Sequence, residues 1–228
     1  AEGQYIYMVG MCHSDFPLHG AWHSPTEPDA TYTYVVKYNP AIREVVYSTY
    51  YGGFWQYGTS SRKNFDVYNG EVSVFGMAND EFPVNRPLPG TMPPQGTRGV
   101  QAGVFTLHSS GALRASSFFG GPGKFTHHSI HRRGTELYLF GEVYDSVRGI
   151  TENAIERTAW FDGLTPSKVF AIVPVDLDSV CYMSYIFPAK DRHGAYPQEE
   201  GALVAMHVDE SNGDAVFVYG PTEIGRYP

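Results

Sequence analysis

Histidines are the residues whose spacing first suggests chemistry, because His127, His128 and His131 fall within five positions. They lie in a run that is expected to form an extended strand. Side chains alternate across a strand, so His127 and His131 share one face. They would then lie about 13 Å apart, too far to bind one metal ion. These histidines are therefore expected at a polar surface or channel.

Metal ligation is considered at two further places. His19 and His23 lie in a predicted loop over residues 18–30, but no third ligand stands at a spacing typical of a metal site. Cys12 and Cys181 are too few for a disulfide framework or a zinc site of four thiolates, and their pairing is left open. We expect no metal and no cofactor, with a metal site in the loop as the weaker alternative.

Acidic residues, which could act in catalysis, occur twice before the same pair of residues. Asp15 and Glu81 each stand directly before a Phe-Pro pair. This recurrence indicates a turn in which an acidic side chain accepts backbone N–H bonds. The glycine-rich run 120–124 lacks the spacing and the helix of a phosphate loop, and no other catalytic or haem motif is found. No catalytic residue is predicted.

The main feature of the chain is a repeat of short apolar strands that end in glycine. The strand-ending glycines follow one another after 66, 65 and 79 residues. A turn glycine precedes each strand, and two turns are Asn-Gly pairs, the favoured two-residue hairpin turn. Each unit is therefore expected to open with a hairpin of strands a and b. The strands cover residues 5–10, 71–76, 136–141 and 215–220 and end at Gly10, Gly76, Gly141 and Gly220; the Asn-Gly pairs are Asn69-Gly70 and Asn212-Gly213.

A second series of residues repeats with the same period. Residues 47–53 read Tyr-Ser-Thr-Tyr-Tyr-Gly-Gly and align with residues 115–121 and, more loosely, with residues 182–188. Each run follows a predicted strand c and a turn, so it is expected to form strand d. The two series together predict a four-stranded antiparallel unit, a-b-c-d, about every 67 residues. The glycines that close this run are Gly52, Gly53, Gly120 and Gly121.

Tandem four-stranded antiparallel units are typical of a β-propeller, whose sheets stack face to face over aromatic and β-branched residues. We therefore predict one all-β region over residues 1–228. Its thirteen predicted strands make about three and a quarter blades, fewer than the four to eight of closed propellers. The chain is thus expected to be part of a larger or shared propeller. The blades cover residues 1–53 (b-c-d), 54–121 (a-b-c-d), 122–188 (a-b-c-d) and 189–228 (a-b).

Composition limits the classes of partner. The 228 residues carry a formal net charge of −8, which argues against a nucleic-acid partner because phosphate binding needs clustered Lys and Arg. No apolar run approaches the roughly 20 residues of a membrane span. Aromatic residues make up 15% of the chain beside 25 Gly and 16 Pro, which favours short strands joined by turns.

The repeat resembles the bacterial β-propeller repeat family called SBBP. Asp15-Phe16-Pro17 and Glu81-Phe82-Pro83 match its Asp-Phe-Pro motif, and residues 47–53 match its Tyr-Ser-Thr-Tyr-x-Gly-Gly ending. The likeness is strong over residues 3–121, whereas the third and fourth units lack both motifs. The resemblance implies a propeller repeat of a bacterial secreted, cell-surface or periplasmic protein.

Long loops between strands b and c are expected on one side of the stack, because they join corresponding strands. Loops on a rigid scaffold commonly carry recognition residues, and exposed Trp, Arg and Met suit contact with protein or sugar. Packing of these loops on each other is the alternative. The candidate interaction residues are His19, Trp22 and His23 in the first loop, Arg86, Met92 and Arg98 in the second, and Trp160 in the third.

The expected function is a non-catalytic extracellular or cell-surface scaffold for protein interaction, adhesion or assembly. Its partners would be other subunits or further blades of a longer chain, and carbohydrate is a second class of partner. One alternative is a polysaccharide-active lyase or hydrolase, which predicts a cluster of Tyr, His, Arg and carboxylate in one pocket. Another is a lectin, which predicts equivalent pockets in each blade.

Overall fold

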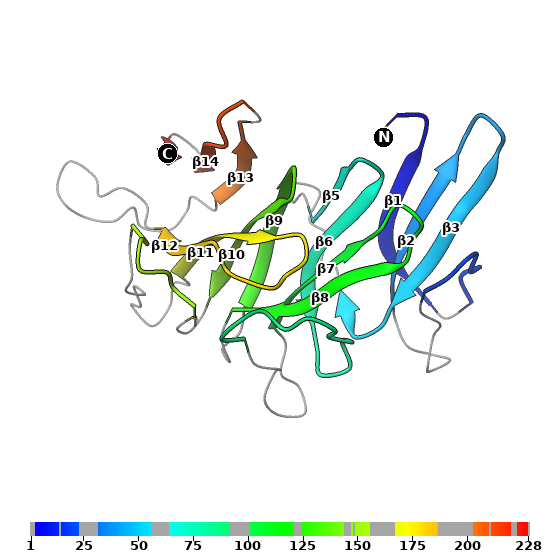
Figure 1. Cartoon of the computed structure of the whole chain (residues 1–228), viewed down its shortest axis with the longest axis horizontal. Coiled ribbons are helices and arrows are strands. Elements are labelled where there is room, and N and C mark those ends of the chain that lie inside the picture. The colour runs from blue at the N-terminus through cyan, green and yellow to red at the C-terminus, as the bar shows by residue number, and fades with distance from the viewer. Residues whose placement is uncertain are drawn as a thin grey trace.

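All regular structure described in this protein is β-strand. A computed structural model describes residues 3–13, 15–22, 32–55, 64–91, 101–120, 125–143, 147, 149–155, 167–186, 203–209, 211–219 and 223–227. Within these residues there are fifteen strands in four antiparallel sheets (Figure 1). The prediction of an all-β chain built from small antiparallel sheets is therefore confirmed.

The first sheet has the order β1-β2-β3 and contains strands b, c and d of the first predicted unit. Its strands are β1 (Ile6–Cys12), β2 (Tyr32–Asn39) and β3 (Glu44–Tyr51).

The second sheet contains a split strand a, because two short strands pair with the same side of its strand b. The first, β4 (Phe54–Trp55), pairs with Met77 and Ala78, and the second, β5 (Phe65–Tyr68), pairs with residues 71–74. β4 follows directly from the first sheet and was not predicted. The other strands are β6 (Glu71–Ala78), β7 (Gln101–Leu107) and β8 (Leu113–Phe119).

The third sheet has the order β12-β11-β10-β9, and the fourth has the order β13-β14-β15. β15 (Glu223–Tyr227) was not predicted, and it pairs with β14 as a strand c pairs with a strand b. The remaining strands are β9 (Phe125–Arg133), β10 (Glu136–Val143), β11 (Ser167–Pro174), β12 (Tyr182–Ile186), β13 (Leu203–Val208) and β14 (Ala215–Tyr219).

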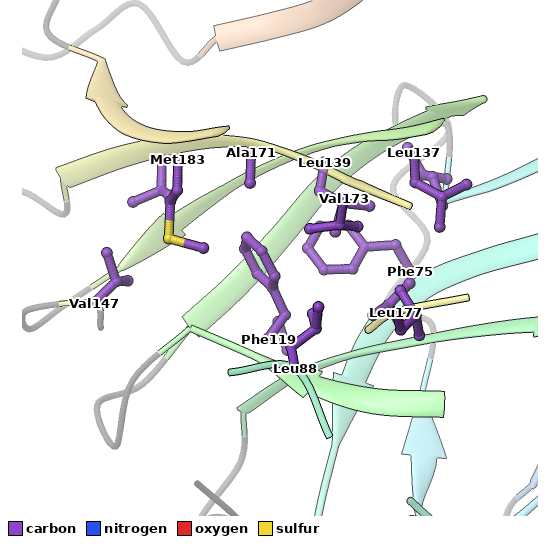
Figure 2. Packing of buried hydrophobic residues seen from close by; sticks show 14 of the residues in the cluster. Phe75, Leu88, Phe119, Leu137, Leu139, Val147, Ala171, Val173, Leu177 and Met183 are labelled. Atoms are coloured by element: carbon purple, nitrogen blue, oxygen red, sulfur yellow. The ribbon is translucent and has the colours of Figure 1, made fainter. Parts of the chain in front are cut away.

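The sheets pack face to face in chain order, because three apolar clusters lie between successive sheets. The cluster between the second and third sheets contains Phe75 and Phe119, whose rings meet edge to face at 5.6 Å (Figure 2). A second cluster joins the first and second sheets, and a third joins the third and fourth. Sheets of this size cannot bury both faces alone, so stacking supplies the core.

Alternation along each strand assigns its side chains to two different clusters. In β10, Leu137 and Leu139 face the second sheet, whereas Tyr138 and Phe140 face the fourth. All four are almost fully buried. A strand apolar at every position is expected when both faces of its sheet are covered.

One of the two predicted Asn-Gly hairpin turns is confirmed and the other is wrong. Asn69 and Gly70 have φ values of +52° and +80° and join β5 to β6 as a two-residue turn. β13 and β14 are instead joined by a wider turn, in which Val208 pairs with Ala215 and the Asp209 N–H donates to the Asp214 carbonyl. There the Asp209 carboxylate accepts the Ser211 N–H, which starts the turn earlier than the Asn-Gly pair.

The prediction of unbroken alternation through the histidines of β9 is also wrong. Phe140 pairs with Ser129 and Gly141 pairs with His127, so His128 is an extra residue in a β-bulge. Beyond the bulge, Ile130 is fully buried and the His131 Nδ1 lies 3.3 Å from the Asp66 carboxylate of the neighbouring sheet.

Among the residues that the structure describes, no helix has the length and apolarity that crossing a membrane requires.

Truncating a ring between the second and third sheets should show how far stability depends on stacking. We expect Phe119→Ala to lower the free energy of unfolding by roughly 3–5 kcal/mol, because Phe119 is fully buried and leaves a cavity. Urea denaturation measures the change. The control Ile42→Ala removes an apolar side chain that is 61% exposed and should change stability by less than about 0.5 kcal/mol. Equal effects of the two changes would contradict the assigned core.

Candidate functional site

The Phe-Pro motif forms the same hydrogen bond in two successive sheets. The Ser48 hydroxyl donates to the Pro17 carbonyl at 2.6 Å, and the Ser116 hydroxyl donates to the Pro83 carbonyl at 2.7 Å. Each serine lies in strand d of the same unit. The repeated motif therefore fastens the start of each b–c loop to its own strand d.

The b–c loops then continue along strand d in all three sheets that have one. His19 and Ser48 exchange two backbone hydrogen bonds, the Arg86 N–H donates to the Ser116 carbonyl, and the Thr151 N–H donates to the Met183 carbonyl. The third loop keeps this path although it lacks the Phe-Pro motif. The start of each loop thus has a repeated position along the edge of its sheet.

The end of strand d in the first sheet is bound to the Phe-Pro turn of the second. The Gly53 carbonyl accepts the Asn79 N–H at 2.8 Å, and the Tyr51 hydroxyl donates to the Pro83 carbonyl at 2.9 Å. Gly53 has a φ of +63°, and a Cβ there would collide with the backbone of Phe82. The second glycine of the Gly-Gly motif is thus required by close contact between sheets.

The turn that receives Gly53 is closed by a residue that the sequence had not singled out. The Asn79 side-chain oxygen accepts the Glu81 N–H at 2.9 Å, as in an Asx turn. Glu81 contributes its backbone N–H to this turn, whereas its carboxylate was expected to be the acceptor. A short polar residue two positions before the acidic residue is the signal that identifies such a turn.

The outer face of the first sheet is the candidate functional site. This open face comprises Ile6, Met8, Phe16, Tyr34 and Tyr38. Phe16 stacks on Tyr34 with ring centroids 4.6 Å apart. Ile6 and Met8 are 41% and 42% exposed, whereas the residues at corresponding positions of the next two sheets are fully buried. Those residues are Val72 and Val74 in β6, and Leu137 and Leu139 in β10.

The predicted loop residues that the structure describes lie near strands d of the first and second sheets. The Trp22 ring, 37% exposed, stacks on Tyr51 at 5.2 Å, and the backbone N–H of Trp22 donates to the Thr49 hydroxyl. His19 lies along β3 and Arg86 along β8, on two different sheets. The candidates His23, Met92, Arg98 and Trp160 lie outside the described residues.

The described motif glycines that close strand d follow their strands as predicted, whereas the prediction that strands b end at Gly10, Gly76 and Gly141 is wrong, because β1, β6 and β10 continue to Cys12, Ala78 and Val143. Gly121 and Gly220 lie outside the described residues. Gly10, Gly76 and Gly141 lie within β1, β6 and β10, Gly52 and Gly53 follow β3, and Gly120 follows β8.

A network of charged side chains joins the second and third sheets at the a–b and c–d turns, and sequence reasoning missed it. The Glu71 carboxylate of β6 lies 2.5 Å from the Arg132 guanidinium of β9 and 2.8 Å from that of Arg114 in β8. Arg114 donates two further hydrogen bonds to Asp176 in the turn after β11. Residues more than forty positions apart form this network, so no local motif could indicate it.

The network shifts the ionisation of its members. Burial alone would raise the pKa of Glu71, but the hydrogen bonds and charges of Arg132 and Arg114 outweigh it and hold that pKa below its ordinary value. The hydrogen bond from Arg114 likewise lowers the pKa of Asp176. Both carboxylates are therefore ionised at neutral pH and hold the two sheets together.

The described His, Cys, Asp and Glu side chains form no metal-binding cluster. In the described part of the chain, no three His, Cys, Asp or Glu side chains gather closely enough to hold a metal ion. Cys12 and Cys181 are free thiols, and burial raises the pKa of Cys12 to about 11, so this thiol is protonated at neutral pH.

A cavity of about 310 Å³ lies between the third and fourth sheets, lined mainly by Phe170, Ile172 and Tyr182, with Glu136 at one side. At the two other junctions the residue that corresponds to Ile172 donates a hydrogen bond to the c–d turn of the following sheet. The Lys37 ammonium donates to the Ser109 carbonyl there, and the Thr106 hydroxyl donates to the Val175 carbonyl. The cavity between the third and fourth sheets therefore lies beside the residue that contacts a c–d turn at the other junctions.

Comparison with known proteins adds no family assignment: no protein-family model and no curated protein matches this chain.

Contact between sheets at Gly53 can be tested with a matched glycine. Gly53→Ala and Gly3→Ala both place alanine at a positive φ, which costs roughly 1–2 kcal/mol. Gly3 has open space around it, whereas the Gly53 methyl would meet backbone of the second sheet. We expect Gly53→Ala to lower the free energy of unfolding by at least about 2 kcal/mol more than Gly3→Ala, measured by urea denaturation. Equal losses would show that the two sheets do not meet at this turn.

The charged network should make stability depend on pH. A carboxylate whose pKa is lower in the folded state stabilises the fold above its unfolded pKa of about 4.3, and this is lost as pH falls through the folded pKa. We expect Glu71→Gln to reduce stability by roughly 2–4 kcal/mol at pH 7, because it leaves the buried Arg132 guanidinium without its counter-charge.

The difference between wild type and Glu71→Gln should shrink as pH falls from the unfolded pKa of about 4.3 through the lower folded pKa, where the wild-type carboxyl becomes protonated. Thermal unfolding at a series of pH values measures it. Glu44→Gln, which changes an exposed carboxylate, should follow the wild-type curve. A pH-independent loss in Glu71→Gln would contradict the assigned ion pair.

Proposed function

We propose that this protein is a β-propeller segment that acts as a non-catalytic scaffold for assembly with other proteins. Face-to-face stacking of four antiparallel sheets supports the propeller architecture. So does the arrangement of strands a: β9 of the third sheet contacts β5 of the second and β13 of the fourth. Contact between successive innermost strands is expected around the axis of a propeller.

The observation that carries the scaffold proposal is the open face of the first sheet. Its residues Ile6 and Met8 are exposed although the corresponding positions in the second and third sheets are buried under a neighbouring sheet, and its aromatic residues Phe16, Tyr34 and Tyr38 are half-buried. Contiguous apolar surface on a folded domain marks an interaction site. Protein is the class of partner that fits this face, because the face is broad, apolar and aromatic.

The secreted or cell-surface setting, periplasm included, rests on the resemblance of residues 3–121 to SBBP repeats, and the net charge of −8 supports partners other than nucleic acid. No observation favours the alternative functions. A lectin would have matching pockets at successive junctions. The depression between the first and second sheets contains Lys37 and Tyr7, whereas the cavity between the third and fourth sheets contains Ile172 and Glu136.

Native mass measurement of the protein purified from its own source tests the scaffold proposal. We expect the native mass to exceed that of one chain, and Met8→Glu to lose the associated protein because a carboxylate cannot be buried there. Met8 is 42% exposed, so the variant should fold as the wild type does.

Ile42→Glu is the matched control for this experiment. It introduces the same charge at an apolar residue that is 61% exposed in the turn between β2 and β3, away from the open face. The control should retain the associated protein. A wild-type native mass equal to one chain, or the same loss in both variants, would contradict the proposal.

A further inference from the structure

We infer that the open face of the first sheet binds one kind of partner, a further sheet of the same repeat whose strand d ends in Tyr-Gly-Gly. This inference rests on the proposed scaffold function and names its partner. It follows from the register of the sheets, from the contacts at the covered junctions and from the edge of β1 with which no described strand pairs.

The strand pairing of the open face repeats that of the covered faces, and the face is open at Ile6 and Met8, whereas Val36 beside Met8 is already buried. Met8 pairs with Val36 in the first sheet, as Val74 pairs with Phe105 in the second. Val74 and Phe105 both belong to the cluster that the first sheet covers. Leu139 and Ala171 pair in the same way in the third sheet and are covered by the second. The open face therefore has the pattern of a surface that receives a preceding sheet.

The covered face of the second sheet shows which groups such a partner must supply. The Tyr51 ring of the first sheet lies 4.0 Å from Phe105, nearly parallel to it, and 5.1 Å from Phe82. Its hydroxyl donates to Pro83, and Gly53 follows it with a carbonyl that accepts the Asn79 N–H. A tyrosine followed by two glycines thus supplies one stacking ring, one donor and one acceptor.

The first sheet holds the receiving groups in place without that partner. The Phe16 N–H donates to the His13 carbonyl at 3.3 Å, as the Phe82 N–H donates to the Asn79 carbonyl at 3.2 Å. The Tyr50 hydroxyl bonds to the carbonyls of both His13 and Phe16, which keeps this turn in shape. Within the described residues the His13 N–H has no acceptor, whereas the Asn79 N–H binds Gly53.

Within the part of the chain that the structure describes, no strand pairs with β1 on the side where a strand a would lie. β6 pairs with β5 and β10 pairs with β9 on that side, but among the described residues β1 pairs with β2 alone. In the second sheet this strand comes from the segment directly after strand d of the first. The same segment of a partner sheet would complete the edge of β1.

The described sheets that contain a strand d cannot themselves provide the covering surface, and within the described residues the fourth sheet has no strand d. At each junction the cover is the opposite face of the preceding sheet, which carries Tyr7, Val35, Tyr47 and Tyr51 in the first sheet. That face of the first sheet is covered by the second, the second by the third, and the third by the fourth. The occupant is therefore an additional sheet of the repeat.

An extended chain tests this inference, with a copy of residues 1–70 placed directly before residues 5–228. The junction keeps the repeat register, since Gly70 precedes Glu71 in the chain as it would precede Tyr5 in the fusion. The copy provides the covering sheet, its Tyr-Gly-Gly ending and the strand a for β1. All of this comes from the protein's own sequence.

Cys12 is a natural reporter of cover on this face, because it stands in β1 at the position of the fully buried Ala78 in β6. With Cys181→Ser, and Cys12→Ser in the copy, one thiol remains in the extended chain. We expect its labelling by a maleimide to be at least about tenfold slower than in the parent chain with Cys181→Ser. We also expect Met8→Asp, made in the residue 5–228 part of the extended chain, to lower its melting temperature by about 5 °C or more. The same substitution in the parent chain should change the melting temperature by no more than about 1 °C.

Substitutions in the copy alone identify the contact that matters. Gly53→Val in the copy should restore fast labelling of Cys12, because its side chain would block the approach of the two turns. Gly3→Val in the copy, at a positive φ with open space, should leave labelling slow. The inference would be overturned if Cys12 of the extended chain were labelled at the rate of the parent chain, whether or not the copy folds. It would also be overturned if Met8→Asp left the melting temperature of the extended chain unchanged.

The result is separable from that of the scaffold proposal. Loss of a native partner in Met8→Glu together with unchanged Cys12 labelling in the extended chain would keep the scaffold and remove the repeat sheet as its partner. Protection of Cys12 together with a native mass of one chain would retain the binding surface and remove the scaffold function.

Discussion

The second and third sheets of this protein are apolar on both faces and have too few strands to bury either face by themselves. Stacking of neighbouring sheets removes both faces from water, and burial of apolar surface contributes most of the free energy that favours folding. The three clusters between successive sheets are the result. Strand pairing, alternation and the placement of aromatic residues in this chain all follow from that requirement.

Polar contacts at the rims set how closely the sheets approach and in what order. At the end of strand d, Gly53 lets two backbones meet where any side chain would hold them apart. At the other ends of the strands, the carboxylates of Glu71 and Asp176 bind arginines in and across the junction. The apolar clusters favour stacking in general, whereas these directional contacts favour one registration of neighbouring sheets.

The need to cover apolar faces also applies to the open face of the first sheet. Apolar positions that are buried in the second and third sheets are exposed at Ile6 and Met8 of the first, and we propose that this surface binds a partner. In that proposal the groups that bind are backbone carbonyls, N–H groups and aromatic rings. The proposed scaffold needs no reactive side chain.

The sequence by itself determined the strands, their grouping into small antiparallel sheets and the Asn69-Gly70 hairpin, because these depend on alternation and turn chemistry within a few residues. Local rules misplaced the turn after β13, where Asp209 binds the backbone first, and missed the bulge at His128 and the strands β4 and β15. Tertiary structure alone decided which faces are covered, why Gly53 must be glycine, and that Glu71 meets Arg114 and Arg132. Those features join residues tens of positions apart, and contact between distant segments is a property of the packed sheets that no local pattern contains.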